Sequence, residues 1–206
     1  MKRMSIVTAI AIGIAGCATV ATDSDYRQAA LDLLKKDFKS KGPATVERML
    51  NQDESQRLCS EYPDPAERPK EVVARVETGQ MKTVKYPADG KYLGQWKEGE
   101  KVAQNGRGMQ SSDKIDGVNG GNCYACHQIT KEEISFGNIG PSLHNYGKLR
   151  GQSEEIMKYT WGKIYNAQAF TACSNMPRFG HSGILTENQI KDVMALLMDP
   201  ASPVNK

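Results

Sequence analysis

The chain has 206 residues, 39% of them hydrophobic, which is enough for one sizeable domain with an extension. Its formal net charge is +3 at pH 7, and losing Lys2 and Arg3 with a leader would lower it by two, to +1. A charge this small argues against nucleic acid as a partner.

The first residues predict export. Lys2 and Arg3 precede an uncharged, mainly apolar run from Met4 to Ile14. The run is too short to cross a bilayer, and with its basic start it is typical of a secretory signal. We therefore expect the mature chain in the periplasm of a bacterium.

The end of this run predicts a lipid anchor. Ile14-Ala15-Gly16-Cys17 resembles the lipobox of bacterial lipoproteins, in which the cysteine becomes the diacylated N-terminus. We expect residues 1–16 to be the signal peptide, Cys17 to carry the lipid and residues 17–24 to form a tether. In that case the lipid would be the chain's only contact with the membrane. Cleavage after Ala18 or Ala21, which would leave no lipid, is the alternative.

Residues 25–90 predict a mainly helical extension. Apolar side chains recur at helical spacing between residue 26 and residue 38, and a second helix is expected from Ala44 to about Leu58. Three prolines then exclude regular helix before Lys70, and the segment Glu71 to Pro87 is ambiguous between strand and helix. Because two short helices bury too little apolar surface to fold alone, we expect the extension to wrap on the main domain.

Residues 91–206 predict a domain of helices separated by glycine-rich loops. Helices are expected from Leu93 to Gln104, from Ser153 to about Tyr165, and after Thr186, where Thr186 and Gln189 can form a capping box. The last helix should stop at Asp199-Pro200. The predicted fold class is therefore all-α.

The most informative motif is Cys123-Tyr124-Ala125-Cys126-His127, the arrangement that attaches a c-type haem. Each thiol can add to one haem vinyl group, and the imidazole follows where it can reach the iron. A structural zinc site would need a second close pair of ligands, which the remaining cysteines and histidines do not provide. A thioredoxin-like dithiol would end an apolar strand, whereas this motif follows the loop 117–122.

Met176 is the first candidate for the second iron ligand. It lies in a non-helical run, Asn175-Met176-Pro177, and the proline stiffens the backbone beside the sulfur. A thioether favours reduced iron and raises the reduction potential. His181 is the runner-up, and an open sixth position would instead indicate a haem enzyme or a ligand sensor.

Four segments together resemble SoxX, the monohaem subunit family of the SoxAX cytochromes of bacterial sulfur oxidation. The resemblance covers about residues 92–200. Its segments are residues 121–128 around the haem motif, Gly137-Asn138-Ile139-Gly140-Pro141-Ser142-Leu143, the run 175–180 and the run 185–190. It implies a class I cytochrome c-like domain with one covalent haem c.

The same resemblance implies roles for single residues. Cys123 and Cys126 would carry the thioether bonds, and His127 and Met176 would be the axial ligands of the iron. The Pro141 carbonyl would accept the proton of the other His127 nitrogen and so fix the ring.

The family's activity then implies partners. A SoxA-like dihaem or monohaem subunit would couple thiosulfate oxidatively to a cysteine of the carrier SoxYZ, and this chain would pass the electrons to a downstream cytochrome or oxidase. With no second haem motif, the chain would be a non-catalytic electron-transfer subunit of an L-cysteine S-thiosulfotransferase. The alternative is a free-standing periplasmic class I cytochrome c that donates to an oxidase or reductase.

The remaining cysteines predict one disulfide. With Cys17 lipidated and Cys123 and Cys126 on haem, Cys59 and Cys173 are left, and in an oxidising compartment they can bridge. A reactive thiol at Cys173 and an intermolecular bridge through Cys59 are the alternatives. Arg178, beside Met176, is a candidate partner for a haem propionate or for a carboxylate of another protein.

Overall fold

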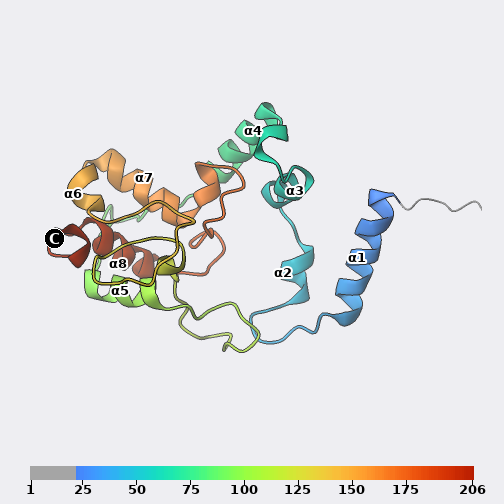
Figure 1. The fold of residues 1–206 in the computed structure, drawn as a ribbon, viewed down its shortest axis with the longest axis horizontal. Helices are drawn as coiled ribbons and strands as arrows, with labels where there is room; N and C mark the ends of the chain where they lie inside the picture. Colours follow the sequence, from blue (N-terminus) through green and yellow to red (C-terminus); the bar gives the residue numbers. More distant parts are fainter. Residues whose placement is uncertain (1–21) are drawn as a thin grey trace, which may run out of the picture. The chain divides into compact units, whose positions relative to one another are not determined.

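The computed structural model describes residues 22–206, and all regular secondary structure in that range is helical (Figure 1). The all-α prediction is therefore confirmed. The α-helices are α1 (Asp23–Asp37), α2 (Val46–Leu50), α3 (Glu54–Glu61), α4 (Lys70–Met81), α5 (Trp96–Gln104), α6 (Tyr146–Arg150), α7 (Glu154–Tyr165) and α8 (Glu187–Met198). Short 3-10 helices lie at η1 (Pro65–Glu67), η2 (Cys123–Ala125), η3 (Ala167–Ala169) and η4 (Pro203–Asn205). None of these helices is long and apolar enough to cross a membrane.

The chain divides into two compact units, one ending at Phe38 and one from Lys39 to Lys206. Helix α1 of the first unit begins at a capping box between Thr22 and Asp25. It buries none of its residues, so its stability comes from local interactions such as this cap. The proposed lipidation site at Cys17 lies outside the described residues.

The expected helix from Ala44 to Leu58 is wrong, because the structure has two helices there. Helix α2 ends at Leu50, and Asp53 starts α3 by accepting a hydrogen bond from the Gln56 backbone N–H at 2.9 Å. The Gln56 side chain accepts in return from the Asp53 N–H at 2.9 Å. A capping box of this kind begins a new helix. The prediction of one helix rested on the spacing of apolar residues, which gives no information on the cap. The ambiguous segment after Lys70 is helix α4.

The main core lies between α5, α7 and α8. Gly99 lets the backbones of α5 and α8 touch, since a Cβ at this position would overlap the Asp192 carbonyl, and Gly94, just before α5, also lies against Asp192. Figure 1 shows α5 and α8 lying against each other, with α6 and α7 alongside. Trp161, Ile190 and Met194 are fully buried in this core.

Residues 39–90 pack against this core within the same compact unit. Leu58 of α3 and Val76 of α4 are buried together with Ala172 in a second, smaller core. The indole N–H of Trp161 donates to the Lys85 carbonyl at 2.8 Å. The helices of this segment therefore reach the long loop between α7 and α8, which contains Met176.

Candidate functional site

The cysteine motif forms a tight turn. Asn122 enters it with a φ of 46°, in the left-handed region, and η2 follows. The backbone N–H groups of Cys126 and His127 both donate to the Cys123 carbonyl, at 3.1 and 2.9 Å. The turn therefore presents both thiols and the imidazole from one short, compact stretch of backbone, Cys123 to His127, and not from separate elements.

The Cys123 thiol is not disposed to act as a thiolate. Burial raises the pKa of Cys123 to about 12, and within the described residues both Cys123 and Cys126 are free thiols. Reactive cysteines and zinc ligands need a thiolate, whereas a thioether carries no charge that burial would penalise. This environment fits covalent attachment of Cys123 through a thioether.

The His127 ring is oriented by the loop that follows it. Its Nδ1 lies 2.7 Å from the Pro141 carbonyl oxygen. A carbonyl can only accept, so Nδ1 carries the proton and Nε2 keeps a lone pair. The Gly140 N–H donates to the Cys126 carbonyl at 2.8 Å, which ties the loop to the haem turn. The arrangement leaves His127 ready to bind a metal through Nε2.

Gly140 is the residue that makes room for this ring. A Cβ at position 140 would overlap the imidazole of His127, and backbone on both sides is already tied down. We expect Gly140→Ala to lower the free energy of unfolding by about 1–3 kcal/mol through overpacking. Denaturant unfolding and the visible spectrum of the oxidised protein would measure the loss and any displaced ligand. Gly79→Ala, where a Cβ meets open space, is the matched control and should cost nothing. Equal stability of the two variants would contradict this role.

Met176 and His127 line the same cavity. Its wall is almost entirely apolar and includes Cys123 and the side chains of Ile129, Leu143, Ile164, Phe179, Leu185 and Leu197. Met176 is partly buried and packs on the main core. The structure thus brings together a free imidazole nitrogen, a thioether and the Cys123 thiol on one apolar cavity, and Cys126 lies in the same turn as Cys123 and His127. This donor set fits a covalently attached haem.

Comparison with known proteins supports this assignment. The cytochrome c family model matches residues 96–199, which is about half of the chain and includes the whole cavity. The chain belongs to the cytochrome c family. It is also 35% identical over 202 residues to an "Uncharacterized lipoprotein" of Aquifex aeolicus (strain VF5), which covers 96% of this chain and 95% of that protein. The cytochrome therefore carries a covalent haem c and acts as an electron carrier.

The other histidines of the cytochrome lie elsewhere. His181, the runner-up for the distal ligand, hydrogen-bonds through Nδ1 to Thr83 Oγ1 at 3.1 Å. Burial lowers its pKa, and the positive charge of Arg178 lowers it further. Both ring nitrogens of His144 are buried without a hydrogen-bond partner among the described residues, and His144 does not line the cavity. Met176 thus stays the first candidate by position.

Cys59 and Cys173 are joined in a disulfide, with their Cα atoms 5.4 Å apart. The bridge connects α3 to the loop that carries Met176, and it lies beside the small core of Leu58, Val76 and Ala172. Neither a free thiol at Cys173 nor an intermolecular bridge through Cys59 is compatible with this pairing.

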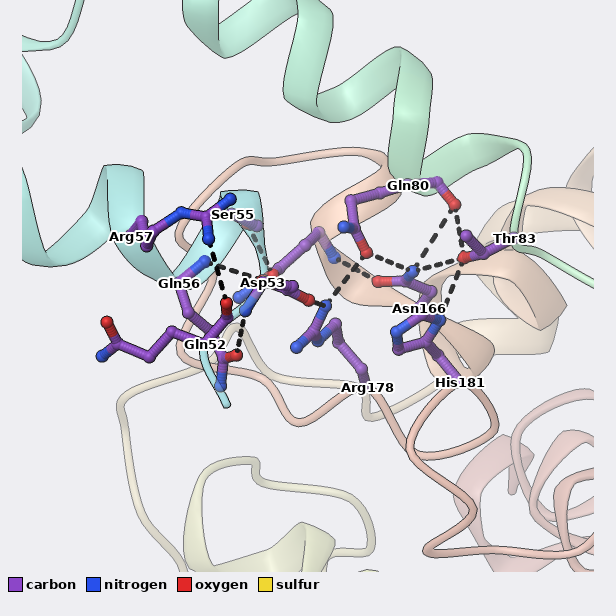
Figure 2. Close-up of polar contacts among 11 residues, drawn as sticks. Gln52, Asp53, Ser55, Gln56, Arg57, Gln80, Thr83, Asn166, Arg178 and His181 are labelled. Atoms are coloured by element: carbon purple, nitrogen blue, oxygen red, sulfur yellow. Dashed lines mark hydrogen bonds and ion pairs between the residues drawn. The ribbon is translucent and has the colours of Figure 1, made fainter. Parts of the chain in front are cut away.

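A polar network next to the disulfide was missed by sequence reasoning (Figure 2). Arg178 pairs with Asp53 within its own chain, at 2.5 Å, rather than with a group outside the polypeptide. It also donates to Gln80 Oε1 at 3.1 Å. Asn166, which is fully buried, donates to Gln80 Oε1 and Thr83 Oγ1 at 2.8 and 2.9 Å. Figure 2 shows these side chains forming one continuous chain of contacts from α3 to His181.

The charge of Asp53 makes this network sensitive to acid. Burial alone would raise the pKa of Asp53, but the Gln56 N–H and the Arg178 guanidinium outweigh it and hold the pKa below 3.8. A carboxylate with a lowered pKa contributes stability that is present above its unfolded value and is lost as the pH falls through its folded value. We therefore expect Asp53→Asn to destabilise the protein at neutral pH and the difference from wild type to shrink below pH 3.8. Denaturant unfolding of both proteins, from neutral pH to below pH 3.8, measures the difference in their free energies of unfolding. A difference that does not change with pH would contradict the ion pair.

Proposed function

We propose that this cytochrome is the electron-transfer subunit of a SoxAX-type complex. It would accept electrons from the oxidative coupling of thiosulfate to the SoxYZ carrier cysteine and pass them to a downstream cytochrome or oxidase. The observation that carries the proposal is the run Gly137–Leu143, which resembles the SoxX family in sequence. Its Gly140 and Pro141 are the residues that accommodate and orient the His127 ring.

In this proposal each site residue has a defined task. Cys123 and Cys126 would hold the haem by thioether bonds, and His127 through Nε2 and Met176 through its sulfur would hold the iron. The haem would supply reversible one-electron chemistry. Pro141 holds the His127 proton on Nδ1 throughout, and the apolar wall excludes water from the ligands. Because the thioether favours reduced iron, the site suits an electron acceptor.

The sequence has one haem-attachment motif, so in this proposal the sulfur chemistry takes place on a partner. The test is to mix the purified cytochrome with thiosulfate, SoxYZ and a SoxA-type subunit, and to follow haem reduction in the visible spectrum. Reduction is expected only when all components are present. Equal reduction without the SoxA-type subunit, or none with it, would contradict the proposal and favour the free-standing carrier.

We also propose that the cytochrome is held at the periplasmic face of a membrane by a lipid on Cys17. The support is the lipobox-like run before Cys17 and the similarity to a relative whose name is lipoprotein. A Cys17→Ser variant is expected to move from the membrane fraction to the soluble fraction. Mass spectrometry of the mature N-terminus provides the control, and a wild-type chain that begins at residue 19 or 22 without acyl groups would contradict the anchor.

A further inference from the structure

Helix α3 is attached to both sides of Met176. Asp53, its N-cap, forms the ion pair with Arg178, two residues after Met176. Cys59, in the same helix, forms the disulfide with Cys173, three residues before Met176. Asp53 and Cys59 are six residues apart, which is about 9 Å along a helix. One rigid element therefore holds the two ends of the short segment Cys173–Arg178.

This segment has little support of its own. It contains no regular secondary structure, and its Cys173 adopts a φ of 62°, in the left-handed region. The Met176 N–H makes one weak local hydrogen bond, to Ser174 Oγ at 3.3 Å. Since a local polar contact of this kind does not fix a loop, the position of the Met176 sulfur depends on its packing against the main core and on what holds the two ends of the segment.

The attachment at Asp53 is itself well fixed. One carboxylate oxygen accepts from the Gln56 N–H at 2.9 Å, and the other accepts from Arg178. The Arg178 side chain is only 11% exposed and that of Asp53 35% exposed, so solvent screens the pair less than a surface ion pair. Ser55, also on α3 and fully buried, donates to Gln168 Oε1 at 2.7 Å and ties the helix to the α7–η3 region. The helix therefore has a fixed place from which to hold the loop.

We propose that α3 positions the distal ligand, with Asp53 and the Cys59–Cys173 disulfide as positioning residues that keep the Met176 sulfur on the iron. This inference rests on the proposed axial role of Met176. The mechanism is a shift of population: a loop held at both ends rarely leaves the iron, and a loop held at one end leaves more often. The extension of residues 39–90 then has a task in the electron carrier, because it sets how firmly the sixth ligand is held.

The test uses the mature, full-length holoprotein with Asp53→Asn. Asparagine caps helices as well as aspartate, so α3 keeps its N-cap and loses only the charge for Arg178. The readout is the binding rate of carbon monoxide to the reduced haem, which requires Met176 to leave, together with the sulfur-to-ferric-iron charge-transfer band. We expect a rate increase on the order of tenfold, because hydrogen bonds to charged groups are the stronger kind, and a weaker band.

Glu54→Gln is the matched control. Glu54 is the next residue along the chain and also pairs with an arginine, Arg75, but both side chains of that pair are more than half exposed. We expect its carbon monoxide rate and band to equal those of wild type. Asp53→Glu, which keeps the charge, should lie between Asp53→Asn and wild type. Replacing both Cys59 and Cys173 by serine should raise the rate independently of Asp53.

The outcomes separate this inference from the proposed function. If wild type lacks the band, Met176 is not the ligand, and its proposed axial role and this inference both fall, while the role in a SoxAX-type complex is still decided by the reduction assay. If wild type has the band and Asp53→Asn binds carbon monoxide at the wild-type rate, Met176 stays the ligand and the positioning role of α3 is overturned. A general loss of helix content in Asp53→Asn with an unchanged band overturns it equally, because Asp53 would then act on the fold and not on the ligand.

Discussion

Replacing Met176 with leucine is expected to remove the charge-transfer band and to let the reduced haem bind carbon monoxide readily. Leucine has nearly the volume of methionine, so the packing beside Phe179 and Leu185 should survive while the sulfur is lost. The reduction potential should fall, since the thioether favours reduced iron; axial ligands set haem potentials over about 0.8 V, and we expect a drop on the order of 0.1 V or more. A redox titration with visible spectroscopy measures both effects.

Met157→Leu is the control for this experiment. Met157 also packs on the main core, but it does not line the cavity. Its variant should keep the wild-type band and potential. An unchanged spectrum in Met176→Leu would remove Met176 as ligand, and the same change in both variants would mean that the effect comes from the core rather than from the iron.

Removing the disulfide should produce the largest loss of stability. The bridge joins residues separated by 114 positions, and in the chain-entropy model a closed loop of this length contributes about 5 kcal/mol to the free energy of unfolding. We expect the double variant Cys59→Ser, Cys173→Ser to lose most of this amount, since both serines leave the loop open. Urea unfolding of the holoprotein, followed by circular dichroism without reductant, measures the difference.

Thiol labelling supplies the check. The unfolded, unreduced wild type should show no label at Cys59 or Cys173, whereas each single serine variant should label at the remaining cysteine. Labelling at both positions in wild type, together with equal stability of the double variant, would mean that the two thiols do not pair in solution.

The parts of the fold that the sequence predicted are those set by neighbours along the chain. The haem turn is specified by a motif of five consecutive residues. The start of α8 is specified by the capping box of Thr186 and Gln189, which spans four residues. The spacing of apolar residues predicted α7 and α8, whose buried faces form the main core. Met176 stood out because a proline follows it in a non-helical run, and the structure places it on the cavity with His127.

Contacts between distant parts of the chain were not predictable in this way. The ion pair of Asp53 and Arg178 joins positions that are 125 residues apart. The residue pattern of neither segment indicates that the two side chains meet. The capping box at Asp53 was readable in principle, as an aspartate followed three residues later by a glutamine. The disulfide was predictable only by counting cysteines. Once Cys17, Cys123 and Cys126 were assigned to the lipid and the haem, Cys59 and Cys173 were the two that remained.

The disulfide also constrains how the molecule is made. Four cysteines of the described chain can form two bridges in three combinations, and every one of them consumes Cys123 and Cys126. Oxidation must therefore stop after a single bridge, or be reversed at the other two sulfurs, before the porphyrin can be added. Burial of Cys123 in the folded chain further disfavours late addition, because its thiolate is then scarce. The order of events during maturation therefore matters: Cys123 and Cys126 must be kept or returned to the reduced state while Cys59 and Cys173 are oxidised.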